Sequence, residues 1–285
     1  MGRVVYINGD YMDEADAKIS VFDRGFLFAD SIYEVLPVYH GRPYFVDRHL
    51  ERLETSLTSA KINMPKLDWS SLFQDLITKN GGGDLQIYLQ ITRGNQGVRK
   101  HDIPNNLTPT IVAYTLHTPY PTYIEKQQGL QACLVEDIRW LRCDIKTTSL
   151  IANILLNDEA VSQGANTALL LRDGYITEGS TSNVFAVDAD GIIRTPPKNN
   201  FCLPGITRQL AIELITSLQW PLHEENMTKD SLLSSQEVWI TSTTKEIYPV
   251  TRIDSVTIGQ GTAGHYWQQL NEKYQQLVKE TDEKK

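Results

Sequence analysis

The sequence predicts an α+β fold that is divided into two domains. Its 285 residues exceed what one small hydrophobic core usually holds. Two prolines within three residues, Pro119 and Pro121, oppose both helix and sheet and indicate a linker. Strand-like and helix-like patterns alternate on both sides of them. We therefore expect an N-terminal α+β domain over residues 1–118, a linker over 119–123 and a C-terminal α+β domain over 124–285.

The N-terminal part begins with a predicted β-hairpin. Residues 4–7 are apolar and lead into Asn8-Gly9-Asp10, a strong turn signal. Leucines at 50, 53 and 57 have helical spacing, which predicts a helix with Asp47 as its N-cap. The remaining predictions for this part are strands over 32–39, 85–91 and 110–114, and a helix over 69–80 that ends at Gly81.

The C-terminal part repeats the alternation of strands and helices. Asp188-Ala189-Asp190-Gly191 is a predicted hairpin turn between two short strands, 184–187 and 192–193. The further predicted elements are strands over 130–135, 167–171 and 238–240, and helices over 149–163, 207–217 and 264–279.

Composition limits the classes of function. The formal net charge of −8 argues against nucleic-acid binding, which needs a basic surface. The three cysteines, Cys133, Cys143 and Cys202, form no Cys-x-x-Cys pair, so neither a disulfide framework nor a metal site is expected. No signal-peptide core or membrane-length apolar run is present. We expect a cytoplasmic protein with no nucleic-acid or membrane partner.

Lys146 has the most informative surroundings in the chain. It follows Arg142-Cys143-Asp144-Ile145 and precedes the apolar run 150–156, at the predicted start of a helix. A lysine held near apolar walls keeps part of its side chain as the free amine. A free amine forms a Schiff base with a carbonyl, which is how enzymes hold pyridoxal phosphate. Taken alone, however, Lys146 is one of 27 basic residues, and a surface cation is the simpler interpretation.

A second motif, Thr177-Glu178-Gly179-Ser180-Thr181-Ser182-Asn183, strengthens this hypothesis. Together with Arg-Trp-Leu-Arg-Cys-Asp-Ile-Lys over 139–146, it closely resembles the fold-type-IV pyridoxal-phosphate enzymes, and D-amino acid aminotransferases in particular. The resemblance implies a smaller N-terminal α/β domain and a larger, β-barrel-like C-terminal α/β domain. It also implies transamination of D-amino acids, with D-alanine and 2-oxoglutarate giving pyruvate and D-glutamate.

The resemblance assigns roles in holding pyridoxal 5'-phosphate. Lys146 would form the Schiff base and move the proton, and Glu178 would face the ring nitrogen. Gly205 precedes a predicted helix start, so backbone N–H groups there can bind an anion. Without the resemblance, Glu178 would be a turn acid and Arg52 a surface helix residue. The other residues that the resemblance places at the cofactor, mostly at its phosphate, are Arg52, Ser182, Ile206, Thr207 and Thr243.

The substrate carboxylate has its own candidate site. Arg99-Lys100-His101 ends a glycine-containing loop, and a guanidinium with an imidazole can hold a carboxylate through charge-assisted hydrogen bonds. It resembles the family's carboxylate site, to which Tyr33 would contribute; an exposed basic loop is the plain alternative. In the family this loop reaches the partner subunit's site, which implies a homodimer.

Two features depart from the family pattern. The loop that leads to Arg99 is one residue longer, and Phe28-Ala29-Asp30-Ser31 stands where many members have glycines, which we expect to narrow the space near the cofactor.

Three other functions fit parts of the pattern. Branched-chain aminotransferases act on L-amino acids, but their carboxylate site lacks Arg-x-His. Aminodeoxychorismate lyase uses the same cofactor for elimination. A cofactor carrier without turnover would share Lys146 and Glu178, yet it would have no need of Arg99 and His101.

Overall fold

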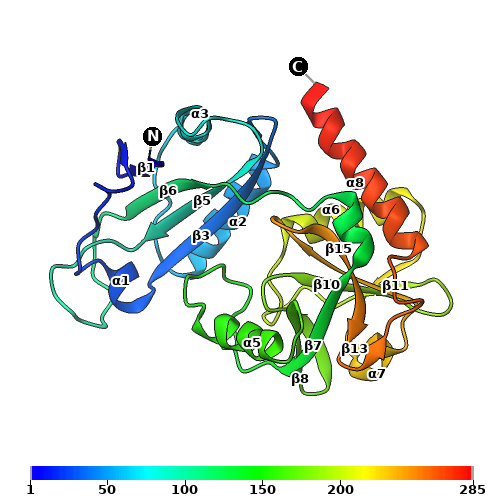
Figure 1. Ribbon diagram of the computed structural model, residues 1–285. Coiled ribbons are helices and arrows are strands. Elements are labelled where there is room, and N and C mark those ends of the chain that lie inside the picture. Colours follow the sequence, from blue (N-terminus) through cyan, green and yellow to red (C-terminus); the bar gives the residue numbers. More distant parts are fainter. Residues whose placement is uncertain (1, 284–285) are drawn as a thin grey trace. The chain divides into compact units, whose positions relative to one another are not determined.

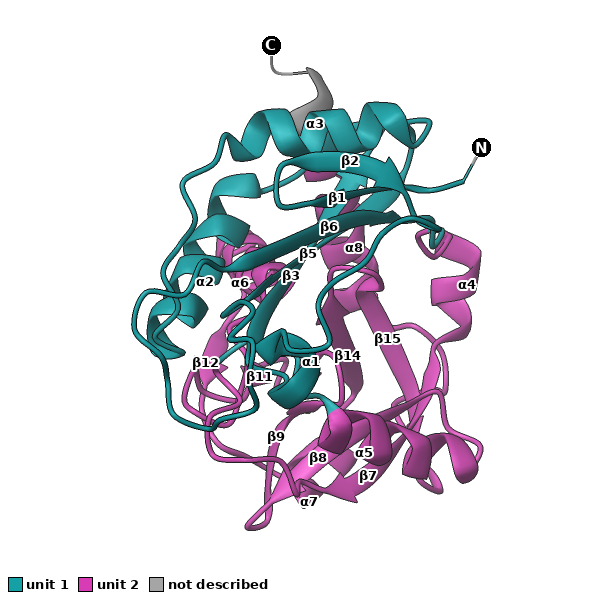
Figure 2. Cartoon of the chain, turned by 90° about the vertical axis from the view of Figure 1, so that its left-hand side faces the viewer, with its two compact units in different colours: residues 1–119, 145–150 teal, residues 120–144, 151–285 magenta. Residues whose placement is uncertain are grey.

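The computed structural model describes residues 2–283, which form two compact units (Figure 2). Unit 1 comprises Met1–Pro119 and Ile145–Leu150, and unit 2 comprises Tyr120–Asp144 and Ile151–Lys285. The short segment that contains Lys146 therefore belongs with the N-terminal part of the chain. The linear domain boundaries expected from the sequence stay a prediction.

Unit 1 is built on one antiparallel sheet with the order β2-β1-β6-β5-β3-β4. Its longest pairing joins β3 to β5 from Ser31–Thr92 to Val38–Leu85. The strands are β1 (Val4–Ile7), β2 (Asp10–Asp13), β3 (Ser31–Tyr39), β4 (Arg42–Pro43), β5 (Leu85–Thr92) and β6 (Thr110–Leu116). The helices are α1 (Arg24–Phe28), α2 (Val46–Ser59) and α3 (Trp69–Lys79).

Helices α2 and α3 pack against this sheet (Figure 1). Their apolar side chains belong to one core with those of the strands. Leu53 and Leu57 of α2 and Phe73 of α3 are fully buried with Ile87 and Leu89 of β5. The leucine spacing thus predicted the buried side of α2 correctly. Ile145, from the excursion, belongs to the same core, which explains why residues 145–150 are part of unit 1.

The predicted N-cap of α2 is wrong. The helix begins at Val46, and its N-cap is Phe45, which has the left-handed backbone conformation (φ 54°) and no side-chain cap. Tyr44, immediately before it, is fully buried, so the chain reversal after β4 determines where the helix starts. Asp47 lies in the first turn instead, where its negative charge interacts favourably with the helix dipole.

Unit 2 contains a curled sheet with the order β12-β11-β10-β14-β15-β7-β8-β9-β13, and β16 pairs with β15. Its strands are β7 (Leu130–Glu136), β8 (Thr167–Arg172), β9 (Tyr175–Gly179), β10 (Asn183–Val187), β11 (Ile193–Thr195), β12 (Leu222–Glu224), β13 (Met227–Thr228), β14 (Glu237–Ser242), β15 (Glu246–Ile253) and β16 (Val256–Thr257). Its helices are α4 (Tyr123–Gln128), α5 (Ile151–Ser162), α6 (Ile206–Ser217), α7 (Lys229–Leu233) and α8 (His265–Glu283).

Strand β7 separates two groups of apolar side chains in unit 2. Cys133 and Val135 pack with Leu156 and Ala160 of α5, whereas Ala132 belongs to the core on the other face of the strand. This alternation follows the two-residue period of a strand. On β14 and β15, helices α6 and α8 supply the cover. The curled sheet agrees with the barrel-like C-terminal part that the resemblance implied.

None of the helices among the described residues is both long enough and apolar enough to cross a membrane.

Candidate active site

Lys146 lies beside the first residues of β3. Tyr33 donates its backbone N–H to the Lys146 carbonyl at 3.0 Å, and Thr148 donates to the Ser31 carbonyl at 3.2 Å. The Lys146 Nζ lies 4.2 Å from the centroid of the Tyr33 ring. The structure therefore brings together two of the predicted residues, one for the cofactor and one for the substrate.

Tyr33 begins a row of tyrosines across the sheet. Its ring stacks on Tyr88 of β5 at 5.7 Å, and Tyr88 stacks on Tyr114 of β6 at 4.8 Å. Burial raises the pKa of the Tyr88 hydroxyl, which donates to Gln90 Oε1 at 2.9 Å. Gln90 in turn donates to the buried Ser31 hydroxyl at 3.2 Å. Ser31 also hydrogen-bonds Thr148, so the residue that departs from the family pattern ties β3 to the lysine segment.

The next residue of β3, Glu34, points to the opposite face and is bound by an arginine and a histidine. Arg52 donates to both of its carboxylate oxygens at 2.8 Å, and His49 Nδ1 lies 2.8 Å from Oε2. All three side chains are buried, so Arg52 is not the surface residue of the plain interpretation. Burial alone would raise the pKa of Glu34, but Arg52 and His49 hold it well below its usual value. Sequence reasoning missed Glu34 and His49, although His49 precedes Arg52 by one helical turn.

The predicted carboxylate residues meet at one aromatic ring. The Arg99 guanidinium lies 5.0 Å from the centroid of Phe28, and the His101 ring lies 5.1 Å from it. Arg99 and His101 are both exposed, in a loop without regular secondary structure. A guanidinium and an imidazole that pack on one ring can donate hydrogen bonds to the same carboxylate.

In unit 2, Glu178 lies near the end of β9 among hydrogen-bond donors. Its Oε1 accepts from Arg139 Nη1 at 2.5 Å, and its Oε2 accepts from the Leu203 N–H at 3.0 Å and Asn183 Nδ2 at 3.2 Å. Burial raises the pKa of Glu178, while Arg139 and the Leu203 N–H oppose that rise. Asp137 fixes Arg139 through two contacts of 2.9 Å. Arg139 was quoted in the motif but given no role; its position in that motif was the available signal.

The start of α6 presents backbone N–H groups without a side-chain cap. Gly205 is the N-cap, and Ile206 and Thr207 are buried in the first turn. A Cβ on Gly205 would stand 2.1 Å from Asn183 Oδ1, the same residue that donates to Glu178. Asn183 therefore connects the helix start to the carboxylate.

Two further predicted residues lie near these elements. Thr243 is in the turn between β14 and β15, the two strands against which α6 packs. The Ser182 hydroxyl is buried and has no hydrogen-bond partner among the described residues. A Cβ on Gly179 would stand 2.3 Å from that hydroxyl, so the glycine leaves room for it.

This donor set fits pyridoxal phosphate. The uncapped helix start and the Ser182 hydroxyl suit an anion, and a buried carboxylate suits a protonated ring nitrogen. Of the predicted residues, Lys146, Arg52, Tyr33, Arg99 and His101 belong to unit 1, and Glu178, Ser182, Ile206, Thr207 and Thr243 belong to unit 2.

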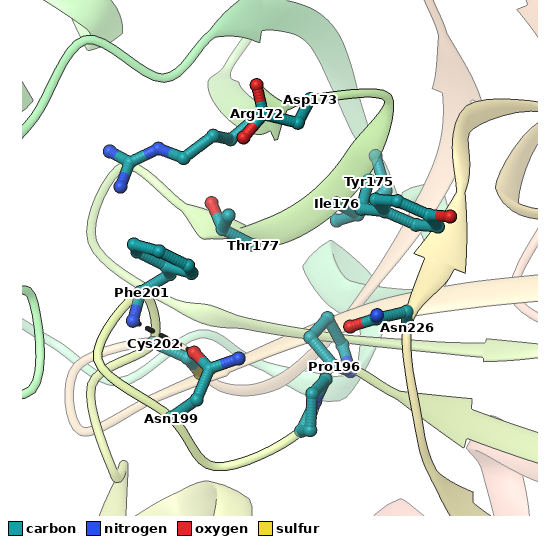
Figure 3. Close-up of a pocket in the computed structure, with 11 residues that line it drawn as sticks. Arg172, Asp173, Tyr175, Ile176, Thr177, Pro196, Asn199, Phe201, Cys202 and Asn226 are labelled. Carbon is teal, nitrogen blue, oxygen red and sulfur yellow. Dashed lines mark hydrogen bonds between the residues drawn. The ribbon is translucent and has the colours of Figure 1, made fainter. Parts of the chain in front are cut away.

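A cavity of about 190 Å³ in unit 2 lies between the β8–β9 hairpin and the segment 196–202 (Figure 3). Thr177 lines it and donates to Asp137 Oδ2 at 2.9 Å, so the cavity adjoins the group that fixes Arg139. The Arg172 guanidinium stacks on Phe201 at 4.7 Å at its rim. None of the residues predicted for the cofactor or substrate is among those that line it.

Comparison with known proteins gives the class. A sequence profile described as amino-transferase class IV matches residues 31–253. The chain belongs to this family, which makes it a fold-type-IV aminotransferase.

Individual relatives narrow the resemblance. The chain is 39% identical over 262 residues to a D-alanine aminotransferase of Bacillus licheniformis, covering 91% of this chain and 92% of that protein. It is also 39% identical over 277 residues to a D-alanine aminotransferase of Staphylococcus epidermidis, covering 96% of this chain and 97% of the relative.

Among solved structures, a T.th. branched-chain amino acid aminotransferase with pyridoxamine 5'-phosphate has a TM-score of 0.87 and 26% identity. The match covers 98% of this chain and 94% of the other. An Escherichia coli branched-chain amino acid aminotransferase has a TM-score of 0.88 over 97% of this chain and 95% of its own; at 23% identity it supports the fold alone.

Proposed function

We propose that this enzyme transfers the amino group of D-amino acids to 2-oxo acids, with D-alanine and 2-oxoglutarate giving pyruvate and D-glutamate. The relatives at 39% identity that are named D-alanine aminotransferases support this assignment. The observation that carries it is the convergence of Arg99 and His101 on Phe28. That convergence provides two donors for the carboxylate of a small amino acid.

We propose pyridoxal 5'-phosphate as the cofactor. The Lys146 amine would attach it, and Glu178 would hold the proton at its ring nitrogen. Ser182, Ile206, Thr207, Thr243 and Arg52 would bind its phosphate. When bound, pyridoxal phosphate supplies an electrophilic carbon and an electron-withdrawing ring.

The protein's own residues would do the rest of the work. The free amine of Lys146 would accept the proton from the substrate Cα and would later donate it again as the product forms. The ring of Tyr33 lies 4.2 Å from the lysine amine and would orient it. At the substrate carboxylate, Tyr33 would join the Arg99 and His101 that the loop of the partner subunit supplies. The carboxylate contacts position Cα for a single face of proton transfer, which is the basis of stereospecificity.

The alternative with structural support is a branched-chain, L-specific aminotransferase, because the solved neighbours carry that name. The deciding experiment follows pyruvate formation from D-alanine and from L-alanine with 2-oxoglutarate, in a coupled assay. We expect turnover with the D-enantiomer. Equal or faster turnover of L-alanine, or of L-leucine in a glutamate-release assay, would refute the D-specific assignment. Elimination from aminodeoxychorismate without amino transfer would instead identify a lyase.

We also propose a homodimer, as the family loop implies, and a cytoplasmic location. Helix α5 exposes Ile151, Ile154 and Leu155, which stand at i, i+3 and i+4 and so lie on one side of the helix. The loop before Lys146 exposes three more large apolar side chains, Ile138, Trp140 and Leu141. Apolar surface of this kind is typical of an interface. Light scattering should give the dimer mass, and Ile154→Glu should shift it toward the monomer. A monomeric parent enzyme would refute the proposal.

The three cysteines are buried and form no disulfide, which supports the proposed cytoplasmic location.

A further inference from the structure

The loop that carries Arg99 and His101 is organised by one buried side chain, Arg24 of α1. Arg24 is 4% exposed, whereas Arg99, Lys100 and His101 are exposed residues outside helix and strand. Backbone contacts also tie the loop's beginning to α1, because the Arg24 N–H donates to the Gly94 carbonyl at 3.0 Å.

The Arg24 guanidinium holds the loop by its backbone. Nη1 donates to the Lys100 carbonyl at 2.6 Å and to the Asp102 carbonyl at 3.3 Å, and Nη2 donates to the His101 carbonyl at 3.3 Å. Nη1 also donates to Gln96 Oε1 at 2.7 Å, on the other side of the loop. Three successive carbonyls around one guanidinium fix the backbone of the Arg-x-His segment, because the fork of a guanidinium is planar and rigid.

Phe28, one turn further along α1, holds the side chains. Three groups lie near its ring. Measured to the ring centroid, the Arg24 guanidinium is at 4.9 Å, the Arg99 guanidinium at 5.0 Å and the His101 imidazole at 5.1 Å. Two guanidinium groups near one ring repel each other, and Asp30, 2.8 Å from Arg24 Nε, offsets part of this charge.

Asp30 also provides a matched comparison. Arg93 binds the same carboxylate at 2.7 and 2.9 Å, but its other contacts are the carbonyls of Ala60 and Lys61, away from the loop. Arg24 and Arg93 are both buried and share one counter-charge. Of these two arginines, Arg24 alone contacts the backbone of residues 100–102.

We propose that Arg24 and Phe28 are positioning residues for the substrate carboxylate: Arg24 fixes the backbone of residues 100–102, and Phe28 fixes the Arg99 and His101 side chains. The identity of the substrate rests on the proposed function. The positioning role itself rests on the contacts of Arg24 and Phe28. Neither residue needs to touch the substrate. Their effect is to hold the two donors in one arrangement before the carboxylate arrives, which lowers the entropy cost of binding.

The kinetic test compares four single variants of the holoenzyme: Arg24→Lys, Phe28→Leu, Arg93→Lys and Phe26→Leu. Phe26 is in the same helix but is 68% exposed, so it serves as the control for Phe28. For Arg24→Lys and Phe28→Leu we expect the KM for D-alanine to rise about tenfold with kcat changed less than about threefold, since carboxylate contacts are made in the ground state and transition state alike. Arg93→Lys and Phe26→Leu should leave KM within about twofold.

A second measurement does not depend on the identity of the substrate. Trypsin cleaves after Arg99 and Lys100, and its rate there, followed by mass spectrometry of the holoenzyme, reports how well the loop is held. Arg24→Lys should accelerate this cleavage at least about fivefold over Arg93→Lys at equal global stability, because only the former loosens the loop.

The outcomes separate the two proposals. Faster cleavage in Arg24→Lys, in an enzyme that does not use D-alanine, would support the loop role and reject the proposed function. Equal cleavage and equal KM in the Arg24 and Arg93 variants would overturn the inference. A fall in kcat with KM unchanged in Phe28→Leu would also overturn it, since that pattern indicates a role in chemistry rather than in carboxylate binding.

Discussion

Asn183 Oδ1 lies 2.1 Å from the place where a Cβ on Gly205 would stand, while the Nδ2 of the same side chain donates to Glu178. The glycine has an ordinary backbone conformation (φ −65°), so the constraint is space and not strain. One asparagine thus couples the start of α6 to the carboxylate proposed for the ring nitrogen.

Gly205→Ala is therefore expected to displace Asn183 and to weaken both ends of the proposed cofactor site. The unfolding free energy should fall by about 1–3 kcal/mol, as for overpacking. The dissociation constant for pyridoxal phosphate, measured by absorbance titration, should rise. In the Asn183→Ala background the same substitution should cost much less, because its obstacle is gone. Strict additivity of the two substitutions would contradict this account.

Arg139→Met removes the cation that faces Glu178. Both carboxylates that it binds, Glu178 and Asp137, are buried, and breaking a buried pair by removing one partner costs about 3–5 kcal/mol. Urea unfolding should measure this loss. The double variant Arg139→Met/Glu178→Gln should recover part of the stability but not the activity. A single variant as stable as the parent enzyme would show that other donors suffice for Glu178.

Lys146→Ala should abolish covalent attachment of the cofactor. Borohydride treatment of the parent enzyme should fix a pyridoxyl group on the peptide that contains Lys146, and the variant should give no such label. Turnover should fall by roughly three orders of magnitude or more, since both the attachment and the proton carrier are lost. A label on another lysine of the parent enzyme would refute the assignment of Lys146.

The Glu34, His49 and Arg52 group should make the protein sensitive to acid. Burial lowers the pKa of His49 below its ordinary 6.5, so the unfolded chain binds its proton first and stability falls as the pH drops below 6.5. The pKa of Glu34 is held below its ordinary 4.5, so its contribution is present above pH 4.5 and is lost as the pH falls further.

Each unit of difference between the folded and unfolded pKa is worth about 1.4 kcal/mol. The measurement is urea unfolding from pH 8 to pH 4. His49→Gln should flatten the slope between pH 6.5 and pH 5. His40→Gln, at an exposed histidine, is the control and should leave the slope as it is. An unchanged slope in the His49 variant would place the acid sensitivity elsewhere.

Lys126→Met tests a buried ion pair that is remote from the proposed chemistry. Lys126 and Glu246 are almost fully buried and in contact, and Asn271 of α8 accepts from Lys126 at 3.1 Å. The substitution should lower the unfolding free energy by about 3 kcal/mol or more, because the Glu246 charge stays buried. Activity per folded molecule should be unchanged. Lys126→Met/Glu246→Gln should be more stable than Lys126→Met alone.

Local patterns in the sequence predicted much of the fold. The Asn8-Gly9 turn, the leucine stripe of α2 and the hairpin around Asp188–Gly191 all depend on neighbours within a few residues, and the structure confirms each of them. The Asp47 cap failed because the buried Tyr44 determines where α2 begins. Short elements such as α1 were not predicted, since five residues carry too little periodicity.

The site was predictable only where a motif is continuous in sequence. The roles proposed for Lys146 and Glu178 come from such motifs, and they stay predictions. Glu34 is bound by Arg52, which is 18 positions away, and Arg24 is bound to carbonyls more than 70 positions away. Contacts over such separations follow from the packed fold, and a single sequence does not display them.

The chain leaves unit 2 after Asp144, contributes Ile145–Leu150 to unit 1 and then returns. During synthesis, a nascent chain that ends at Pro119 lacks the buried Ile145 and the strip that borders β3. The N-terminal half can therefore complete its interior only after residue 150 has left the ribosome. A fragment of residues 1–119 should accordingly be incomplete, and the maturation of the two halves is interdependent.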